Sequence, residues 1–195
     1  MGTVGFLLLC GGHSGRMGCQ KALLPVGEET LCAHIARAGE GFRERIFSSN
    51  GGVEVPEGYL PVADSFMDCG PMGGLHAALS TCKSDALVCA PCDAPYYSKE
   101  LAAFLSDALT EEWDALILQD ETGRMHPLMG VYAKTCLPAL KAHLEAGSLR
   151  MMRLLSAVRT RVMTLPADFS QQVFMNLNTP EAYAQFLKQR GKPQP

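Results

Sequence analysis

The feature that most constrains this chain is a continuous apolar segment, residues 4–10, which ends directly in two glycines. A strand that is apolar at every position is typical of a parallel sheet whose two faces are both buried. Strand-like segments recur later, at residues 45–49, 85–90, 115–118, 128–132 and 162–165, and stretches with helical spacing mostly separate them. This alternation predicts an α/β fold with a mostly parallel sheet covered by helices on both faces.

Length and composition fit a single domain with a sizeable core. The chain has 195 residues, of which 47% are hydrophobic and 19% are charged, and its net charge is −3. A nucleic-acid binder would show a large basic excess, and a membrane helix needs roughly 20 consecutive apolar residues. We therefore expect one domain over residues 1–190, a frayed tail at 191–195, a cytoplasmic location, and neither nucleic acid nor membrane as a partner.

Eight cysteines are spread over the chain. A chain of this length and apolar content needs no disulfide framework, so most of them are expected to be free thiols in a reducing compartment. Cys89 and Cys92 form a C-x-x-C pair, but a structural zinc site normally needs four ligands, and no second pair exists. We expect one buried thiol and one loop thiol there.

Polar and glycine-rich segments follow several of the predicted strands. They are the loop at residues 11–21, Asn50, Asp64 and Asp93. Ligands of open α/β sheets bind beyond the carboxyl ends of the strands, so these positions are the candidate binding site.

The loop at residues 11–21 has four glycines and no acidic residue, and it carries Arg16 and Lys21. Glycines let backbone amides approach a phosphate, and two cations supply charge for a polyphosphate. The spacing fits neither the dinucleotide fingerprint nor a P-loop, because Gln20 precedes the lysine and Ala22 follows it. The alternative is a flexible loop with solvated charges.

Asp93 lies in a Pro-Cys-Asp-Ala-Pro turn after a predicted strand. Mg²⁺ is usually held by one or two carboxylates together with phosphate oxygens, so Asp93 is a candidate metal ligand. The competing interpretation is an ordinary turn aspartate beside proline. Asp64 has the same ambiguity.

A basic stretch without any acidic residue covers residues 146–167. It is either a solvated helix face or a binding surface for an anionic second substrate. Arg150 is the best candidate for the second role, because a helix beginning beside it would add its positive dipole end. Arg124 and His126 could serve the same site.

Taken together, these residues resemble the nucleotidyltransferases of molybdenum cofactor biosynthesis, and among them the guanylyltransferase family. The matching motifs run from residue 7 to about 186. They are Leu9-Cys10-Gly11-Gly12 with Arg16-Met17-Gly18-Cys19-Gln20-Lys21, Asp64 with Gly70-Pro71, Pro91-Cys92-Asp93-Ala94-Pro95, His126-Pro127-Leu128, and Asn176-Leu177-Asn178-Thr179-Pro180. Two positions depart from the family pattern: Cys10 replaces an alanine, and Gln20 replaces an aspartate.

The resemblance implies a three-layer, Rossmann-like nucleotidyltransferase fold and a role for each motif. Leu9, Cys10, Gly11 and Gly12 would hold the nucleotide, with Asn50 and Asp64 placing its base or ribose. Lys21 and Arg16 would contact the phosphates, and Asp93 would bind Mg²⁺. The second substrate is assigned to Arg124, His126, Arg150, Asn176 and Asn178.

The reaction that the resemblance implies is transfer of GMP from GTP to the terminal phosphate of molybdopterin, with release of pyrophosphate. An anionic phosphate nucleophile requires no strong general base, so catalysis would rest on alignment and charge neutralisation. Three alternatives remain open. The same chemistry could use CTP on the same cofactor, or it could use a sugar phosphate as the acceptor. The third is a non-catalytic module that delivers nucleotide or cofactor. Transient partners would be molybdoenzymes or their chaperones.

Overall fold

The computed structural model describes residues 2–10, 20–49 and 51–190. A seven-stranded sheet forms its centre, in the order β5-β4-β1-β6-β8-β7-β9. The strands are β1 (Val4–Cys10), β4 (Arg45–Ser49), β5 (Leu60–Val62), β6 (Ala86–Pro91), β7 (Ala115–Gln119), β8 (Met125–Ala133) and β9 (Thr160–Thr164). Every strand pair is parallel except the two that β8 makes, with β6 and β7. The prediction of a mostly parallel sheet is confirmed.

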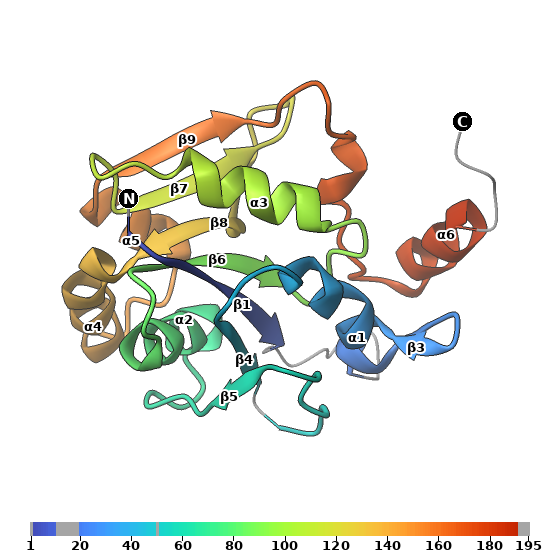
Figure 1. Ribbon diagram of the computed structural model, residues 1–195, viewed down its shortest axis with the longest axis horizontal. Coiled ribbons are helices and arrows are strands. Elements are labelled where there is room, and N and C mark those ends of the chain that lie inside the picture. Colours follow the sequence, from blue (N-terminus) through green and yellow to red (C-terminus); the bar gives the residue numbers. More distant parts are fainter. Residues whose placement is uncertain (1, 11–19, 50, 191–195) are drawn as a thin grey trace.

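Helices cover both faces of this sheet (Figure 1). The helices are α1 (Leu31–Ala36), α2 (Gly70–Thr81), α3 (Lys99–Ala108), α4 (Leu137–Glu145), α5 (Met151–Ala157) and α6 (Pro180–Arg190). Short 3₁₀ helices lie at η1 (Lys21–Leu23), η2 (Arg37–Gly39), η3 (Lys134–Cys136) and η4 (Gln171–Phe174), and a two-stranded hairpin joins β2 (Pro25–Val26) to β3 (Glu29–Thr30). None of the helices that the structure describes is long and apolar enough to cross a membrane.

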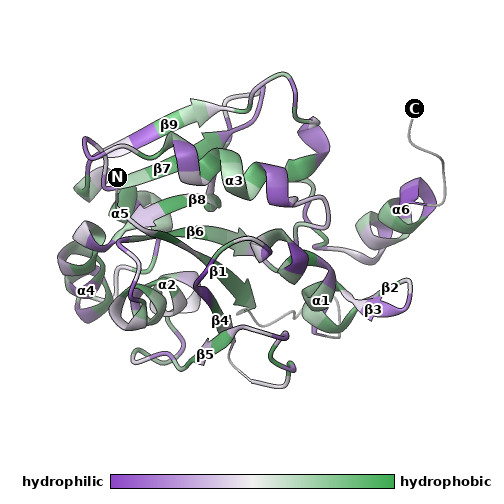
Figure 2. Cartoon of the chain, in the orientation of Figure 1, coloured by the Kyte–Doolittle hydropathy of each residue, from purple (hydrophilic) through white to green (hydrophobic). Residues whose placement is uncertain are grey.

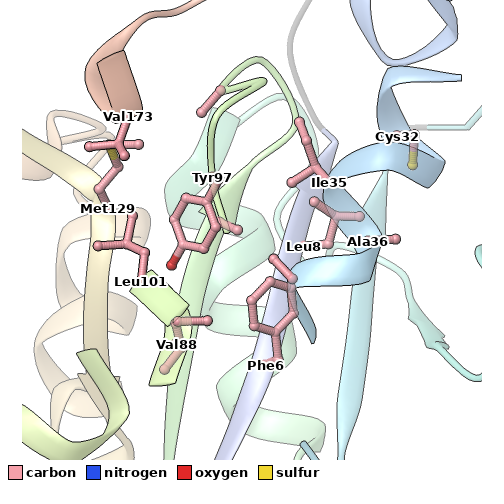
Figure 3. Close-up of a cluster of buried hydrophobic side chains, with 14 of the residues drawn as sticks. Phe6, Leu8, Cys32, Ile35, Ala36, Val88, Tyr97, Leu101, Met129 and Val173 are labelled. Atoms are coloured by element: carbon pink, nitrogen blue, oxygen red, sulfur yellow. The ribbon is translucent and has the colours of Figure 1, made fainter. Parts of the chain in front are cut away.

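Alternation along the central strands creates two cores. In β1, Phe6 and Leu8 face one cluster, and Leu7 and Leu9 face the other. The first cluster is closed by α1, α3 and α6, and Figure 3 shows Phe6, Leu8, Ile35 and Tyr97 converging in it. The second is closed by α2, α4 and α5. The two central strands β1 and β6 are mostly green, hydrophobic, in Figure 2, which is why their sequence lacks an apolar–polar alternation.

The site-bearing edge of the sheet is the one at which its parallel strands end. The arrowheads of β1, β6 and β9 point towards this carboxyl-terminal edge, and α6 lies beyond it (Figure 1).

Two helices begin at a capping side chain. Ser98 caps α3 by accepting from Leu101 N, as its sequence position predicts. Thr179 caps α6 in the same way, accepting from Ala182 N at 3.2 Å.

The sequence from Asp64 to Gly74 is rich in glycine and indicates a loop, but α2 already begins at Gly70. Gly-Pro-x-Gly-Gly has poor helix propensity, but Pro71 is at the first turn, where its missing N–H costs no hydrogen bond. Burial of Met72 and the two glycines against the sheet overrides the propensity of the sequence. The helical spacing of the sequence extends back to Glu29, but α1 begins two residues later, after Thr30, whose side chain accepts from Ala33 N.

Candidate active site

The ends of β1 and β6 lie side by side at the carboxyl-terminal edge. Leu9 pairs with Pro91 in the parallel register, and Cys92 N donates to Leu9 O at 3.0 Å. Asp93 therefore follows β6 directly beside the last residues of β1. The carbonyl of Asp93 accepts from Leu177 N at 2.8 Å, so a segment more than 80 residues later in the chain is held against the same turn.

Three predicted site residues meet at this turn. Lys21, the first residue of η1, has its ammonium 3.3 Å from Asp93 Oδ2 and donates a second hydrogen bond to Asn178 Oδ1. The side chains of Lys21 and Asp93 are 19% and 22% exposed, so both are partly withdrawn from water but still reachable by a ligand. The three residues come from parts of the chain up to 157 positions apart. We call this cluster, Lys21, Asp93 and Asn178, the lysine site.

Asp64 lies elsewhere along the edge, after β5. Ser48 Oγ, one residue before the end of β4, donates to Asp64 Oδ1 at 3.4 Å. Burial raises the pKa of the Asp64 carboxyl, and this hydrogen bond opposes the rise only in part. Two strands, β4 and β1, separate β5 from β6, so Asp64 flanks the lysine site and does not join it.

Two glycines of α2 allow the helix to approach Asp64 and Ser48. A Cβ on Gly74 would come within 2.4 Å of Ser48 Oγ and 2.8 Å of Leu9 Cδ2. A Cβ on Gly73 would lie 3.2 Å from Asp64 Oδ2. The close packing of α2 on the ends of β1 and β4 therefore depends on glycine at these positions.

His126 belongs to a separate cluster near the start of β8. Its Nε2 lies 3.0 Å from Asp120 Oδ2, and its ring stacks on Phe174 of η4 with centroids 4.2 Å apart. Hydrogen bonds from Thr122 and then from His126 hold the pKa of Asp120 well below its usual range. His126 is buried, so its ring is held in place between Asp120 and Phe174. Phe174 then leads along the chain to Asn176.

The arginines predicted for the second substrate are less well placed. Arg124 is exposed, and only its backbone joins the Asp120 turn. Arg150 is exposed at the start of α5, and no contact among the described residues links it to the lysine site. Asn176 is partly buried, and its side chain makes no hydrogen bond within the described part of the chain. These assignments stay predictions.

One arginine of the basic stretch has a structural partner that the local sequence does not reveal. Arg159 donates to both oxygens of Asp114, at 3.0 Å from Nε and 2.7 Å from a terminal nitrogen. These bonds hold the pKa of Asp114 well below its usual range. Arg159 also lines a groove of about 1370 Å³ at the opposite, amino-terminal edge of the sheet, with Thr3, Lys83 and Asp85. The groove is remote from the lysine site.

Cys89 and Cys92 do not form one site. Cys89 lies in the core cluster under α2, whereas Cys92 packs against the cluster under α1, on the other face of the sheet. Burial raises the pKa of the Cys89 thiol, so it stays protonated at neutral pH. Cys10 and Cys32 lie 3.6 Å apart between their sulfurs within the α1-side core, and both are free.

Several predicted nucleotide contacts cannot be placed. Gly11, Gly12, Arg16 and Asn50 lie outside the described residues, as does the tail at 191–195. Leu9 and Cys10 form the end of β1, as expected for residues that lead into a phosphate loop. Sequence reasoning missed Ser48 and Phe174. A serine at the end of the strand before Asn50 was the available signal for Ser48.

The donor atoms at the lysine site suit a divalent cation held jointly with a phosphate. No group of three or more His, Cys, Asp or Glu side chains arranged to hold a metal occurs within residues 2–10, 20–49 and 51–190. Asp93 supplies a carboxylate with one oxygen facing Lys21, and the phosphate oxygens of a substrate could supply further ligands. This is the usual situation for Mg²⁺, which takes one or two carboxylates plus phosphate oxygens.

Comparison with known proteins decides the family. Residues 6–162 match the MobA-like NTP transferase domain. This chain is a member of that nucleotidyltransferase family. It is also 34% identical over 168 residues to a Flavobacterium johnsoniae protein named probable molybdenum cofactor guanylyltransferase, covering 85% of this chain and 87% of the relative. The family recognised from the five motifs is therefore confirmed.

Solved structures share the fold of this NTP transferase. The molybdopterin-guanine dinucleotide biosynthesis protein A of Archaeoglobus fulgidus superposes with a TM-score of 0.82 at 20% identity, covering 98% of this chain and 100% of that one. A Mycobacterium tuberculosis protein solved as a complex with manganese superposes with a TM-score of 0.65 at 19% identity, covering 96% and 99%. At these identities the likeness confirms the α/β nucleotidyltransferase fold.

Proposed function

We propose that this chain transfers GMP from GTP to the terminal phosphate of molybdopterin, forming the guanine dinucleotide cofactor and pyrophosphate. The observation that carries the proposal is the lysine site at the carboxyl-terminal edge, in a chain of the MobA-like NTP transferase family. A cation and a metal-binding carboxylate side by side suit a triphosphate. The name of the Flavobacterium johnsoniae relative supports guanine as the base and the molybdenum cofactor as the acceptor.

Asp93 would hold Mg²⁺ in this reaction, and the cation would neutralise phosphate charge. Lys21 donates to the phosphates, with Arg16 and the glycines at 11 and 12 adding donors from the loop that follows β1. The acceptor phosphate is anionic at neutral pH, so the site needs no general base. An ammonium and a carboxylate side by side suit catalysis by alignment and charge neutralisation.

The remaining assignments divide the edge of the sheet into two parts. Asp64, held by Ser48, and Asn50 would place the ribose or base on the β4–β5 side. His126, stacked on Phe174, and Arg124 would face the pterin on the β7–β8 side. The lysine site lies between these parts in the strand order, where the two substrates must meet. We also expect a cytoplasmic enzyme that transiently contacts molybdoenzymes or their chaperones.

Thermal shift with GTP, CTP, ATP and UTP, each with and without Mg²⁺, tests the nucleotide assignment. A ligand that binds only the folded protein raises its melting temperature by mass action. The rise should be largest for GTP with Mg²⁺, the substrate that we propose. A preference for CTP would assign the chain to cytidylyl transfer. Binding of GTP without any pyrophosphate release in the presence of molybdopterin would instead support the delivery module.

A further inference from the structure

Asn178 differs from the other residues predicted for the second substrate, because its side chain contacts Lys21. The ammonium of Lys21 has two partners among the described residues, Asp93 and Asn178. Its distance to Asp93 Oδ2 is 3.3 Å, long for a charge-assisted hydrogen bond, which is normally about 2.7–2.9 Å. The amide oxygen of Asn178 accepts a hydrogen bond from the same ammonium and so holds it from a second side.

We propose that Asn178 is a positioning residue for Lys21, and that it acts on the nucleotide side of the reaction rather than on the pterin side. This inference rests on the proposed function only in taking Lys21 as a phosphate contact. A lysine side chain is a point charge on a flexible stem, and it loses rotamer freedom when it is ordered. An acceptor that orders it beforehand reduces that cost at the moment of nucleotide binding.

The chemistry of asparagine suits this task. Its amide oxygen accepts one proton of the ammonium and leaves the others for phosphate oxygens. It carries no charge, so Lys21 keeps its positive charge towards the phosphates. A carboxylate at position 178 would, with Asp93, place two negative groups around one lysine and weaken its attraction for a nucleotide.

The side chain of Asn178 is exposed, but the residues on either side of it are anchored. Leu177, immediately before it, is fully buried and donates its N–H to the Asp93 carbonyl at 2.8 Å. Thr179, immediately after it, caps α6. Asn178 is therefore fixed from both sides, with one neighbour attached to the Asp93 turn and the other to a helix.

Helix α6 in turn contacts the chain on both sides of the lysine site. Tyr183 OH donates at 2.5 Å to the carbonyl of Pro25, which lies four residues after Lys21. Tyr96 lies three residues after Asp93, and its OH donates to the side-chain oxygen of Gln189 at 2.7 Å. The buried Phe186 also meets the Tyr96 ring edge-on, with the ring centroids 5.4 Å apart. One helix thus connects Asn178 to the segments that carry Lys21 and Asp93.

A double-mutant cycle on GTP affinity tests the proposal, with binding measured by calorimetry in the presence of Mg²⁺. Asn178→Ala should weaken GTP binding about tenfold, or about 1.4 kcal/mol, when Lys21 is present. In a Lys21→Met background the same substitution should change the affinity less than twofold, because there is no ammonium left to position. Equal losses in both backgrounds would overturn the proposal.

Two further variants separate this role from its alternatives. Asn176→Ala removes the same amide two residues earlier and should leave GTP affinity within twofold, whatever it does to the KM for molybdopterin. Asn178→Asp keeps an acceptor in place and should still weaken GTP binding, because it adds charge. If Asn178→Ala instead raises the KM for molybdopterin and leaves GTP binding unchanged, Asn178 is a pterin contact and the inference fails. The cycle needs no turnover, so it stays decisive even if the acceptor is not molybdopterin.

Discussion

Gly74→Ala should destabilise the protein by about 2 kcal/mol, because the added methyl has no room. It would lie 2.4 Å from Ser48 Oγ and 2.8 Å from Leu9 Cδ2, whereas carbon atoms in contact prefer about 3.5–4.0 Å. Overpacking of this severity costs about 3 kcal/mol, the upper end of the usual range. Replacing glycine by alanine inside a helix returns about 1 kcal/mol. For a chain of this size, the difference lowers the melting temperature by about 4–8 °C.

Gly73→Ala is the matched control for this prediction. It makes the same change one residue earlier in α2, where the nearest atoms, Phe66 O and Asp64 Oδ2, lie 3.0 and 3.2 Å from the added Cβ. Its contacts are looser, so a net change within about 1 kcal/mol is expected. Thermal melts of both variants give the comparison directly. A Gly74→Ala protein as stable as the Gly73→Ala protein would refute the packing argument.

The Ser48→Ala background identifies which contact causes the loss. Removing the hydroxyl removes the 2.4 Å approach and leaves the contact with Leu9. Gly74→Ala should therefore cost at least about 1 kcal/mol less in this background than in the wild type. If its cost is the same in both, Ser48 is not the obstacle. The 3.4 Å Ser48–Asp64 hydrogen bond would then also have no part in the effect.

Three further outcomes are expected. Lys21→Ala should weaken GTP binding roughly ten- to a hundredfold by removing a charge-assisted phosphate contact, and near-native affinity in calorimetry would contradict this. Arg150→Ala should leave GTP affinity unchanged and weaken molybdopterin binding about tenfold. If neither affinity changes, Arg150 is only a surface charge, and Arg124 becomes the next candidate for the acceptor site. Arg159 lowers the pKa of Asp114, so this pair stabilises the fold above about pH 4 and progressively less as pH falls below it. Urea melts should show a shallower acid dependence in Arg159→Gln, and an unchanged one would contradict the pairing.

The central strands were predictable because their physics is local. An apolar run such as residues 4–10 can be satisfied only by burial on both faces, and β1 has the bounds that the sequence indicates. Helix ends with a capping side chain, at Ser98 and Thr179, were predictable for the same reason. By contrast, the start of α2 and the short strand β5 depend on packing against the sheet, which composition does not encode.

The candidate site shows the same division. Asp93 and the segment leading to Lys21 were identified because they follow predicted strands, where ligands of open α/β sheets bind. The structure brings Asp93 and Lys21 together. The contact of Lys21 with Asn178 spans 157 residues and could not follow from spacing. Likewise, the stretch around Arg159 contains no acidic residue. The partner of Arg159 is Asp114, which directly precedes β7 and lies 45 residues earlier in the chain.

The most direct test of the proposed activity is to incubate the purified protein with GTP, Mg²⁺ and molybdopterin and to measure both products. We expect pyrophosphate and the guanine dinucleotide cofactor, identified by mass, to form in equal amounts. Asp93→Asn should abolish both, since it removes the carboxylate proposed to hold the metal. Faster turnover with CTP, or stable GTP binding with no pyrophosphate released, would contradict guanylyl transfer as the function of this chain.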